Sequence, residues 1–189
     1  KRARHCYTDG SSFGNQLSGS GYTTVSGKAR IVGSNQAYAG NWNITGTAMT
    51  DESVTSTLIN FGTGEIKIAS NGTLIAKTTG AFDFANQLVG VGTLIADNNN
   101  TEFNFTTSTG DQFAGNVILN NNIFDLENTN TTALTNATLH IGTGNATTVG
   151  TGTQNIGGLA FNGGKLILVM LTQVIPSAIA TLKPAKNLI

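Results

Sequence analysis

Ten carboxylates are the residues of this chain with the most evident capacity for chemistry. Asp125 and Glu127 stand two positions apart, so on a β-strand they would share one face, and Asp51 and Glu52 are adjacent. Two facing carboxylates about 6.5 to 9.5 Å apart can hydrolyse a glycosidic bond with inversion. Because the acids are spread evenly along the chain, a chance pair is expected. We interpret both pairs as solvated surface carboxylates.

Two histidines and one cysteine limit metal and nucleophilic chemistry. His140 lies between Leu139 and Ile141, which predicts an outward position on a strand, and no Cys or acid stands beside it at ligand spacing. No G-x-S-x-G motif marks a nucleophilic serine. His5 and Cys6 lie in a polar N-terminal segment, and a lone cysteine has no disulfide partner. We therefore predict no catalytic, cofactor-binding or metal-binding residues and no enzymatic activity.

Glycine motifs and aromatic residues offer two further candidate sites. Residues 142–144 and 150–152 both read Gly-Thr-Gly, but no G-K-[ST] follows, so we interpret them as turns. The repeat of calcium-binding β-rolls is absent. Tyr22, Tyr38 and Trp42 would stack on sugar rings if they were exposed, or pack the core if they were buried. We favour a core position for Tyr38 and Trp42.

Composition predicts a folded protein with few helices. The chain has 189 residues, 39% of them hydrophobic, with 24 glycines and a formal net charge of +0. Thr, Asn and Gly are poor helix formers, and Thr favours strands.

Five of the ten basic residues lie near the chain ends. The rest of the chain therefore has a net charge of 5 − 10 = −5, which argues against binding to nucleic acid or anionic membranes. No signal peptide and no membrane-length apolar run are visible.

Short apolar runs separated by Asn, Asp, Gly, Ser and Thr predict many short strands. Their centres lie about ten residues apart in the central part of the chain, which is typical of strands joined by turns. Alternation predicts inward positions, namely Ala29, Ile31, Ile66, Ile68, Ala137, Leu139 and Ile141. We expect strands of three to five residues, a loop over residues 46–57, and a short helix only over residues 176–185.

Two repeated segments in the sequence favour a solenoid architecture. Residues 17–21 (L-S-G-S-G) resemble 88–92 (L-V-G-V-G), and residues 37–44 resemble 112–119, in the same order. A parallel β-helix of about six to eight turns, with 20 to 25 residues a turn, fits this spacing. Its core would hold stacked apolar ladders, with Asn and Thr ladders at the corners. The alternative is a β-sandwich, which requires longer alternating strands.

Four segments resemble the passenger region of bacterial autotransporters, whose relatives include pertactin and self-associating adhesins. The segments are residues 88–94 (L-V-G-V-G-T-L), 112–119 (Q-F-A-G-N-V-I-L), 136–142 and 156–166. The resemblance implies a right-handed parallel β-helix, secreted to the bacterial cell surface or outer membrane by a C-terminal membrane barrel that this chain lacks. It specifies architecture rather than a particular activity.

These observations predict an all-β chain with three parts: a tail or N-terminal cap over residues 1–16, a β-helix passenger fragment over 17–168, and a C-terminal cap or appended tail over 169–189. The expected function is that of a non-enzymatic adhesin or structural scaffold for cell–cell or cell–host contact. The expected partners are a host-surface glycan or protein, or like chains, without nucleic acid. The alternatives are a polysaccharide-cleaving β-helix lyase or glycoside hydrolase, and a stalk that binds nothing.

Overall fold

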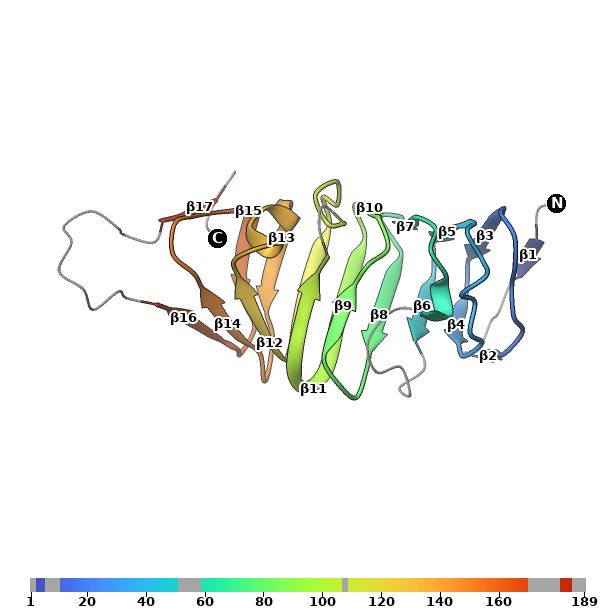
Figure 1. The fold of residues 1–189 in the computed structure, drawn as a ribbon, viewed down its shortest axis with the longest axis horizontal. Coiled ribbons are helices and arrows are strands. Elements are labelled where there is room, and N and C mark those ends of the chain that lie inside the picture. The colour runs from blue at the N-terminus through green and yellow to red at the C-terminus, as the bar shows by residue number, and fades with distance from the viewer. Residues whose placement is uncertain (1–2, 6–10, 51–58, 107–108, 170–180, 185–189) are drawn as a thin grey trace.

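The protein is a rod of β-strands stacked along one axis (Figure 1). The computed structural model describes residues 3–5, 11–50, 59–106, 109–169 and 181–184. The strands lie across the long axis, and the first and last described strands lie toward opposite ends of the rod. Within the described residues the helical elements are one 3₁₀ helix, η1 (Ile59–Phe61), and one α-helix, α1 (Asn130–Ala133).

Two sheets form the walls of the rod, and every described strand pairing is parallel. The five-stranded sheet contains β1 (Ala3–His5), β3 (Tyr22–Val25), β5 (Asn41–Ile44), β7 (Ile66–Ile68) and β10 (Leu88–Gly90). The main path of the long sheet contains β2 (Ser11–Phe13), β4 (Lys28–Ile31), β6 (Thr47–Thr50), β8 (Thr73–Lys77), β11 (Thr93–Phe105), β12 (Asn116–Leu126), β13 (Leu134–Ile141), β15 (Thr153–Phe161) and β17 (Thr181–Pro184). Three strands branch from this path, namely β9 (Phe82–Phe84), β14 (Ala146–Val149) and β16 (Lys165–Leu168).

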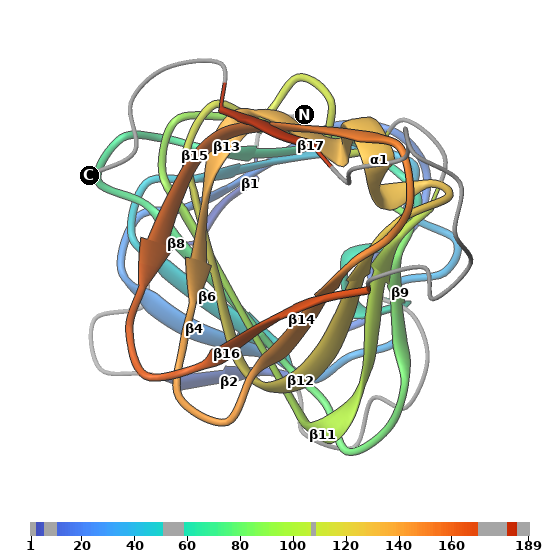
Figure 2. The same ribbon diagram turned by 90° about the vertical axis from the view of Figure 1, so that its left-hand side faces the viewer.

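Successive strands of each sheet belong to successive turns of a solenoid. Ser11 pairs with Ala29, 18 positions later, and Thr47 pairs with Thr73, 26 positions later. Seen from the C-terminal end in Figure 2, the chain turns counter-clockwise as it advances toward the viewer, which is right-handed winding. The predicted right-handed parallel β-helix is therefore confirmed, with about seven turns. A sandwich is excluded because its neighbouring strands would run antiparallel.

Some strand lengths differ from the sequence-based predictions. Strands β1 and β2 lie within residues 1–16 and β17 lies within 169–189, so parallel pairing extends past residues 17–168 at both ends. Strands β11, β12, β13 and β15 contain 13, 11, 8 and 9 residues, so the prediction of three to five was wrong for them. Strands β11 and β12 continue around a corner of the solenoid through polar residues, 97–101 and 120–122, that resemble strand ends in the sequence.

Two local predictions were also wrong. Residues 47–50 of the expected loop form β6, because Ala48 and Thr50 face the interior and Thr50 Oγ1 donates a hydrogen bond to the Lys77 carbonyl at 2.7 Å. Residues 181–184 of the expected helix form β17, because their backbone pairs with Thr153–Ile156 of the previous turn. Residues 51–57, 176–180 and 185 of these two segments lie outside the described residues.

The repeated segments of the sequence, residues 17–21 and 88–92, form similar local structures. Gly19 and Gly90 both have positive φ, +77° and +105°, and each forms a parallel bridge to an aromatic residue one turn later, Tyr38 and Phe113 respectively. The Gly19 carbonyl accepts from the Ala39 amide at 2.8 Å, and the Gly90 carbonyl accepts from the equivalent Ala114 amide at 2.9 Å. The first copy leads into β3 of the five-stranded sheet and the second into β11 of the long sheet. The two copies of the repeated motif therefore form the same type of corner, but they occupy different positions within a turn of the solenoid.

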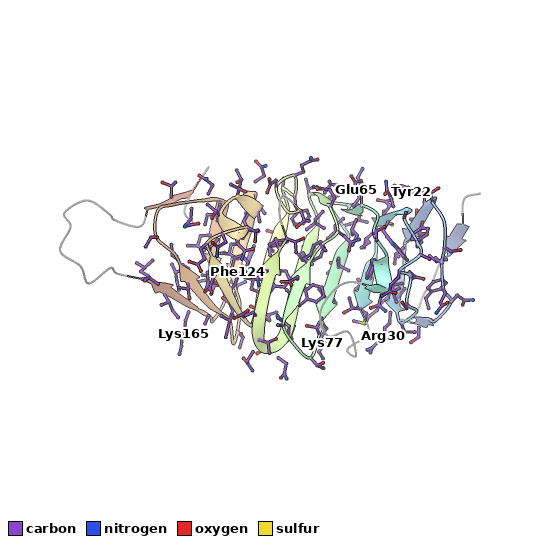
Figure 3. All side chains as sticks on the ribbon, in the orientation of Figure 1. Tyr22, Arg30, Glu65, Lys77, Phe124 and Lys165 are labelled. Atoms are coloured by element: carbon purple, nitrogen blue, oxygen red, sulfur yellow. The ribbon has the colours of Figure 1, made fainter. Side chains whose placement is uncertain are left out.

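Apolar side chains that alternate along the strands fill the interior. All seven predicted inward residues are at most 2% exposed. A phenylalanine ladder crosses β9, β11 and β12, where the ring of Phe103 stacks on Phe82 at 5.9 Å between centroids and lies 6.1 Å from Phe124. Figure 3 shows Phe124 inside the rod and Lys77 at its periphery. The ladder joins three successive turns through side-chain packing, in addition to the backbone hydrogen bonds.

Buried asparagines join the turns at the corners. Asn122 Nδ2 donates to the Ala96 carbonyl of the preceding turn at 3.1 Å, and Asn145 Nδ2 of the next turn donates to Asn122 Oδ1 at 2.6 Å. Asn86 Nδ2 instead donates to two backbone carbonyls, those of Gly62 and Gly64. The predicted corner ladder exists at Asn122 and Asn145, whereas the buried amides of Asn35 and Asn86 donate to backbone carbonyls that a parallel corner leaves unpaired.

Candidate functional site

A regular outward face runs along the long sheet. One set of register partners, here the threonine row, comprises Thr47, Thr73, Thr93, Asn116 and Thr138. Two positions further along each strand lies the isoleucine row, which comprises Met49, Ile75, Ile95 and Ile118. Both rows are half-buried apart from exposed Asn116. Because adjacent parallel strands lie about 4.8 Å apart, each row places a similar side chain at that interval along the rod.

A polar groove lies at one corner of this face. It has a volume of about 440 Å³ and is lined by Lys77, Thr78, Thr79, Asp97, Asn99, Asn100 and Asn121. Asp97 and Lys77 are register partners on β11 and β8. Asn121 Nδ2 lies 3.2 Å from each carboxylate oxygen of Asp97 and donates to them. The groove thus combines hydroxyl, amide, carboxylate and ammonium groups on three successive turns.

Asp125 and Glu127, one of the two predicted carboxylate pairs, are not among the residues that line this groove. Asp125 is half-buried on β12, opposite Thr148 of β14, and Glu127 is exposed just after the strand. Asn104 Nδ2 on β11 donates to Asp83 Oδ1 on β9 at 3.4 Å, and neither residue lines the groove. Asp51, Glu52 and Cys6 lie outside the described residues, and the structure places only the backbone of His5, in β1.

His140 is on the outward face of β13, as predicted, and continues the isoleucine row beyond Ile118. Its Nε2 lies 3.0 Å from Asn116 Oδ1, and its Nδ1 lies 3.4 Å from Asn162 Nδ2. This arrangement suits a neutral ring that donates through Nε2 and accepts through Nδ1. Partial burial lowers the pKa of His140 by desolvating the charged form.

Acidification is expected to weaken the fold slightly through His140. The lowered pKa means that the unfolded chain binds a proton more readily, so stability is lost as pH falls below about 6.5. The loss should stay under about 1 kcal/mol because solvent screens a partly exposed group. Urea unfolding at pH 7 and pH 5 should show a smaller decrease for His140→Gln than for the wild type. An equal decrease in both proteins would contradict this role.

Tyr38 and Trp42 belong to the core, as predicted. They are 5% and 1% exposed, and Trp42 Nε1 donates to the Phe61 carbonyl at 2.8 Å. The Tyr38 hydroxyl pairs with Thr23 Oγ1 at 2.8 Å. Tyr22 is 47% exposed, so the three aromatics form no common sugar-stacking surface.

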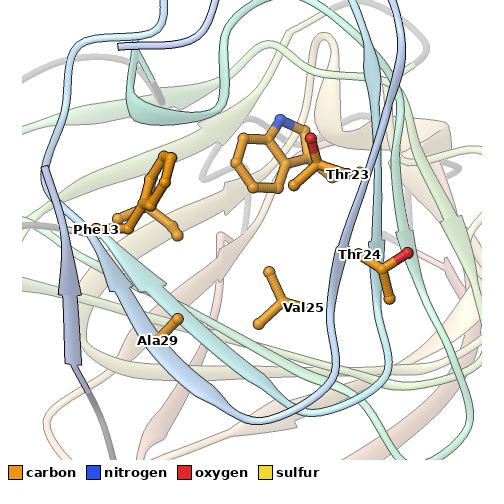
Figure 4. A pocket seen from close by; sticks show the side chains of 7 residues that line it. Phe13, Thr23, Thr24, Val25 and Ala29 are labelled. Carbon is orange, nitrogen blue, oxygen red and sulfur yellow. The ribbon is translucent and has the colours of Figure 1, made fainter. Parts of the chain in front are cut away.

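A small, half-open pocket lies beside Trp42 near the N-terminal end of the rod. In Figure 4 the side chains of Phe13, Val25 and Ala29 lie around it. Its volume is about 10 Å³, which corresponds to about one water molecule, so it is a packing defect rather than a ligand site.

The remaining candidate motifs have structural positions. Gly144 and Gly152 have positive φ, +73° and +91°, which agrees with turn glycines in both Gly-Thr-Gly motifs. Among the residues that the structure describes, no three His, Cys, Asp or Glu side chains cluster in a way that could hold a metal ion. In the same residues, no helix has the length and apolar character needed to cross a membrane.

Sequence reasoning missed the residues of the polar groove. Its only signal was the run of three asparagines at positions 98–100, which reads as a turn. The other contributors come from turns about 20 residues earlier and later, such as Lys77 and Asn121. Their proximity depends on the register of β8, β11 and β12, which the sequence alone does not specify.

Two proteins of Escherichia coli K12 are similar to this chain. Uncharacterized protein YuaQ is 37% identical over 149 residues, which is 78% of this chain and 10% of that protein. Uncharacterized lipoprotein YdeK is 43% identical over 112 residues, which is 56% of this chain and 8% of that protein. No family model and no solved structure matches. The chain therefore spans about a tenth of the length of the curated relatives that it matches.

Proposed function

We propose that this chain is a segment of an autotransporter-like passenger protein that acts at the bacterial cell surface as a non-enzymatic adhesin or scaffold. Its partner is a host-surface glycan or protein, or another copy of the chain. A membrane barrel elsewhere in the full-length protein exports it. The name of one relative, a lipoprotein, supports a location in the cell envelope. The resemblance of residues 88–94 and 112–119 to passenger repeats supports the surface assignment.

The threonine and isoleucine rows are the observation that carries this proposal. A hydroxyl or amide and an aliphatic side chain recur together on four successive strands, from Thr47 and Met49 to Asn116 and Ile118. Each rung offers one weak polar contact and one small apolar contact. Repetition along a stiff rod converts such weak contacts into avidity without a deep pocket. This chemistry suits adhesion or scaffolding better than glycoside hydrolysis, which requires two convergent carboxyl groups.

Beads coated with the chain test the proposal. We expect them to aggregate with one another, or to adhere to epithelial cells, more than beads coated with albumin. The double variant Thr73→Lys/Thr93→Lys places two charges on adjacent rungs of the threonine row. It should reduce the count of bound or aggregated beads about tenfold, because about 1.4 kcal/mol of contact free energy is lost. Flow cytometry provides the count.

The matched control is Thr24→Lys/Asn43→Lys, which places two lysines on adjacent rungs of the five-stranded sheet instead. This control should behave as the wild type. Coated beads that bind nothing, or two variants that lose binding equally, would contradict the proposal. Release of reducing ends from polysaccharides by the wild-type chain would favour the enzymatic alternative instead.

A further inference from the structure

The polar groove is built around a protruding loop in β11. Between the pairs Asp97–Asn120 and Thr101–Asn122, β11 contains two more residues than β12. The extra residues, Asn99 and Asn100, are exposed and have φ of +56° and +60°. Asparagine tolerates this left-handed conformation better than most residues. The bulge therefore projects two consecutive amide side chains from the corner of the rod.

Side-chain hydrogen bonds hold this loop in one shape. Asn98 is 1% exposed, and its Nδ2 donates to the carbonyls of Glu102 at 2.6 Å and Thr101 at 3.2 Å. Thr101 Oγ1 donates back to the Asn98 carbonyl at 2.6 Å. A loop closed from both ends loses little further conformational entropy when a ligand binds. The amides of Asn99 and Asn100 are thus presented by a preorganised backbone.

The floor of the groove is also fixed. Asn121 Nδ2 donates to both oxygens of Asp97, and the Thr78 amide donates to the Asp97 carbonyl at 3.0 Å. A carboxylate has about four lone-pair sites, so two acceptor sites of Asp97 stay available to a ligand. Thr79 is exposed at the margin and adds a hydroxyl.

The groups of the groove select a neutral, hydroxyl-rich ligand. One lysine and one aspartate balance in charge, which favours neither an anion nor a cation. Amides both donate and accept, carboxylates accept, and a sugar hydroxyl can donate to one while it accepts from the other. The volume of about 440 Å³ lies within the range of small-molecule sites. A saccharide matches this combination of charge balance, polarity and size.

We propose that the polar groove binds a neutral saccharide, whose adjacent hydroxyl groups hydrogen-bond to the Asp97 carboxylate and to the amides of Asn99 and Asn100. This inference rests on the proposed function, since it specifies the glycan partner and the place where it binds. Without an aromatic stacking platform the site should be weak, with a Kd of about 1 mM. Attachment through it depends on many copies acting together.

Nuclear magnetic resonance of the ¹⁵N-labelled chain tests the site. Lactose, maltose and N,N′-diacetylchitobiose are titrated to about 20 mM, above the expected Kd, with 3′-sialyllactose as an anionic arm. At least one neutral sugar should shift the amide signals of the polar groove, including the side-chain amides of Asn99 and Asn100. Absence of shifts with every neutral sugar, or shifts with sialyllactose alone, would overturn the inference.

A glycine double variant separates side-chain recognition from folding. Asn99→Gly/Asn100→Gly keeps residues that accept positive φ while it removes both amides. The control Asn128→Gly does the same at another exposed left-handed asparagine, with φ of +49°, outside the groove. The sugar-dependent shifts should disappear, with at least a tenfold weaker Kd, only in the first variant. Equal binding by both variants would contradict the site.

The bead assay distinguishes this inference from the proposed function. Beads that adhere through the threonine row, while the glycine double variant and the sugars have no effect, would refute the groove but leave the proposed function intact. Saccharide binding in the groove by a chain whose beads adhere to nothing would support the site and refute the adhesin.

Discussion

Phe103→Ala is expected to lower the free energy of unfolding by about 3 to 5 kcal/mol, the cost of truncating a fully buried phenylalanine. Phe103 is 0% exposed and contacts aromatic rings on the preceding and following turns, Phe82 and Phe124. Its removal leaves a cavity that rigid parallel strands cannot close. Urea unfolding followed by circular dichroism gives the free energy.

Phe161→Ala is the matched control for this substitution. Phe161 is an inward register partner of Ile141, yet it is 56% exposed, because no described strand covers it at the C-terminal end of the rod. The control should cost under about 1 kcal/mol. A loss at Phe103 no larger than the loss at Phe161 would show that the phenylalanine ladder does not stabilise the solenoid.

Asn122→Asp is expected to destabilise the fold by about 3 kcal/mol or more at pH 7. Asn122 is 0% exposed and donates to the Ala96 carbonyl while its Oδ1 accepts from Asn145 Nδ2. A carboxylate cannot donate to the Ala96 carbonyl, and its charge is buried without a cationic partner. Burial should raise the pKa of the introduced group, so the variant should recover part of the difference as pH falls toward about 4.

Asn128→Asp supplies the comparison for the corner asparagine. Asn128 is exposed and left-handed, and Asp also tolerates this conformation, so the change should cost under about 0.5 kcal/mol at either pH. Similar losses for the two variants, or a loss at Asn122 that does not depend on pH, would contradict the role assigned to the corner ladder.

Alternation allowed the inward residues to be predicted from the sequence. Ile66 and Ile68 flank Lys67, and Leu139 is flanked by Thr138 and His140, so the facing sides could be assigned from two-residue periodicity alone. The solenoid itself followed from the recurring glycine motifs, which the structure shows as equivalent corners. The two-residue alternation and the recurring glycine motifs could be recognised from the sequence because both depend on residues close together in the chain.

Strand length and the polar groove could not be predicted in the same way. The asparagines at positions 98–100 resemble a strand end, and the chain does leave the ladder there. Parallel pairing resumes at Thr101, however, because the neighbouring strand β12 runs on past the bulge. Turn residues in the sequence thus indicate where the chain leaves the sheet, but they do not indicate with which strands the residues on either side of that point pair. The groove depends on register between turns, which is a tertiary property.

Distances between spin labels along the threonine row, extended by one rung to Lys28, the register partner of Thr47, test the central claim most directly. Labels are placed by cysteine substitution at Lys28 and Thr93, and at Lys28 and Thr138, with Cys6 replaced by serine. These positions are three and five rungs apart. Double electron–electron resonance should therefore give distances near about 14 Å and about 24 Å, at about 4.8 Å a rung. Distances that do not increase in this proportion would contradict the stacked solenoid and the regular face on which the proposed function depends.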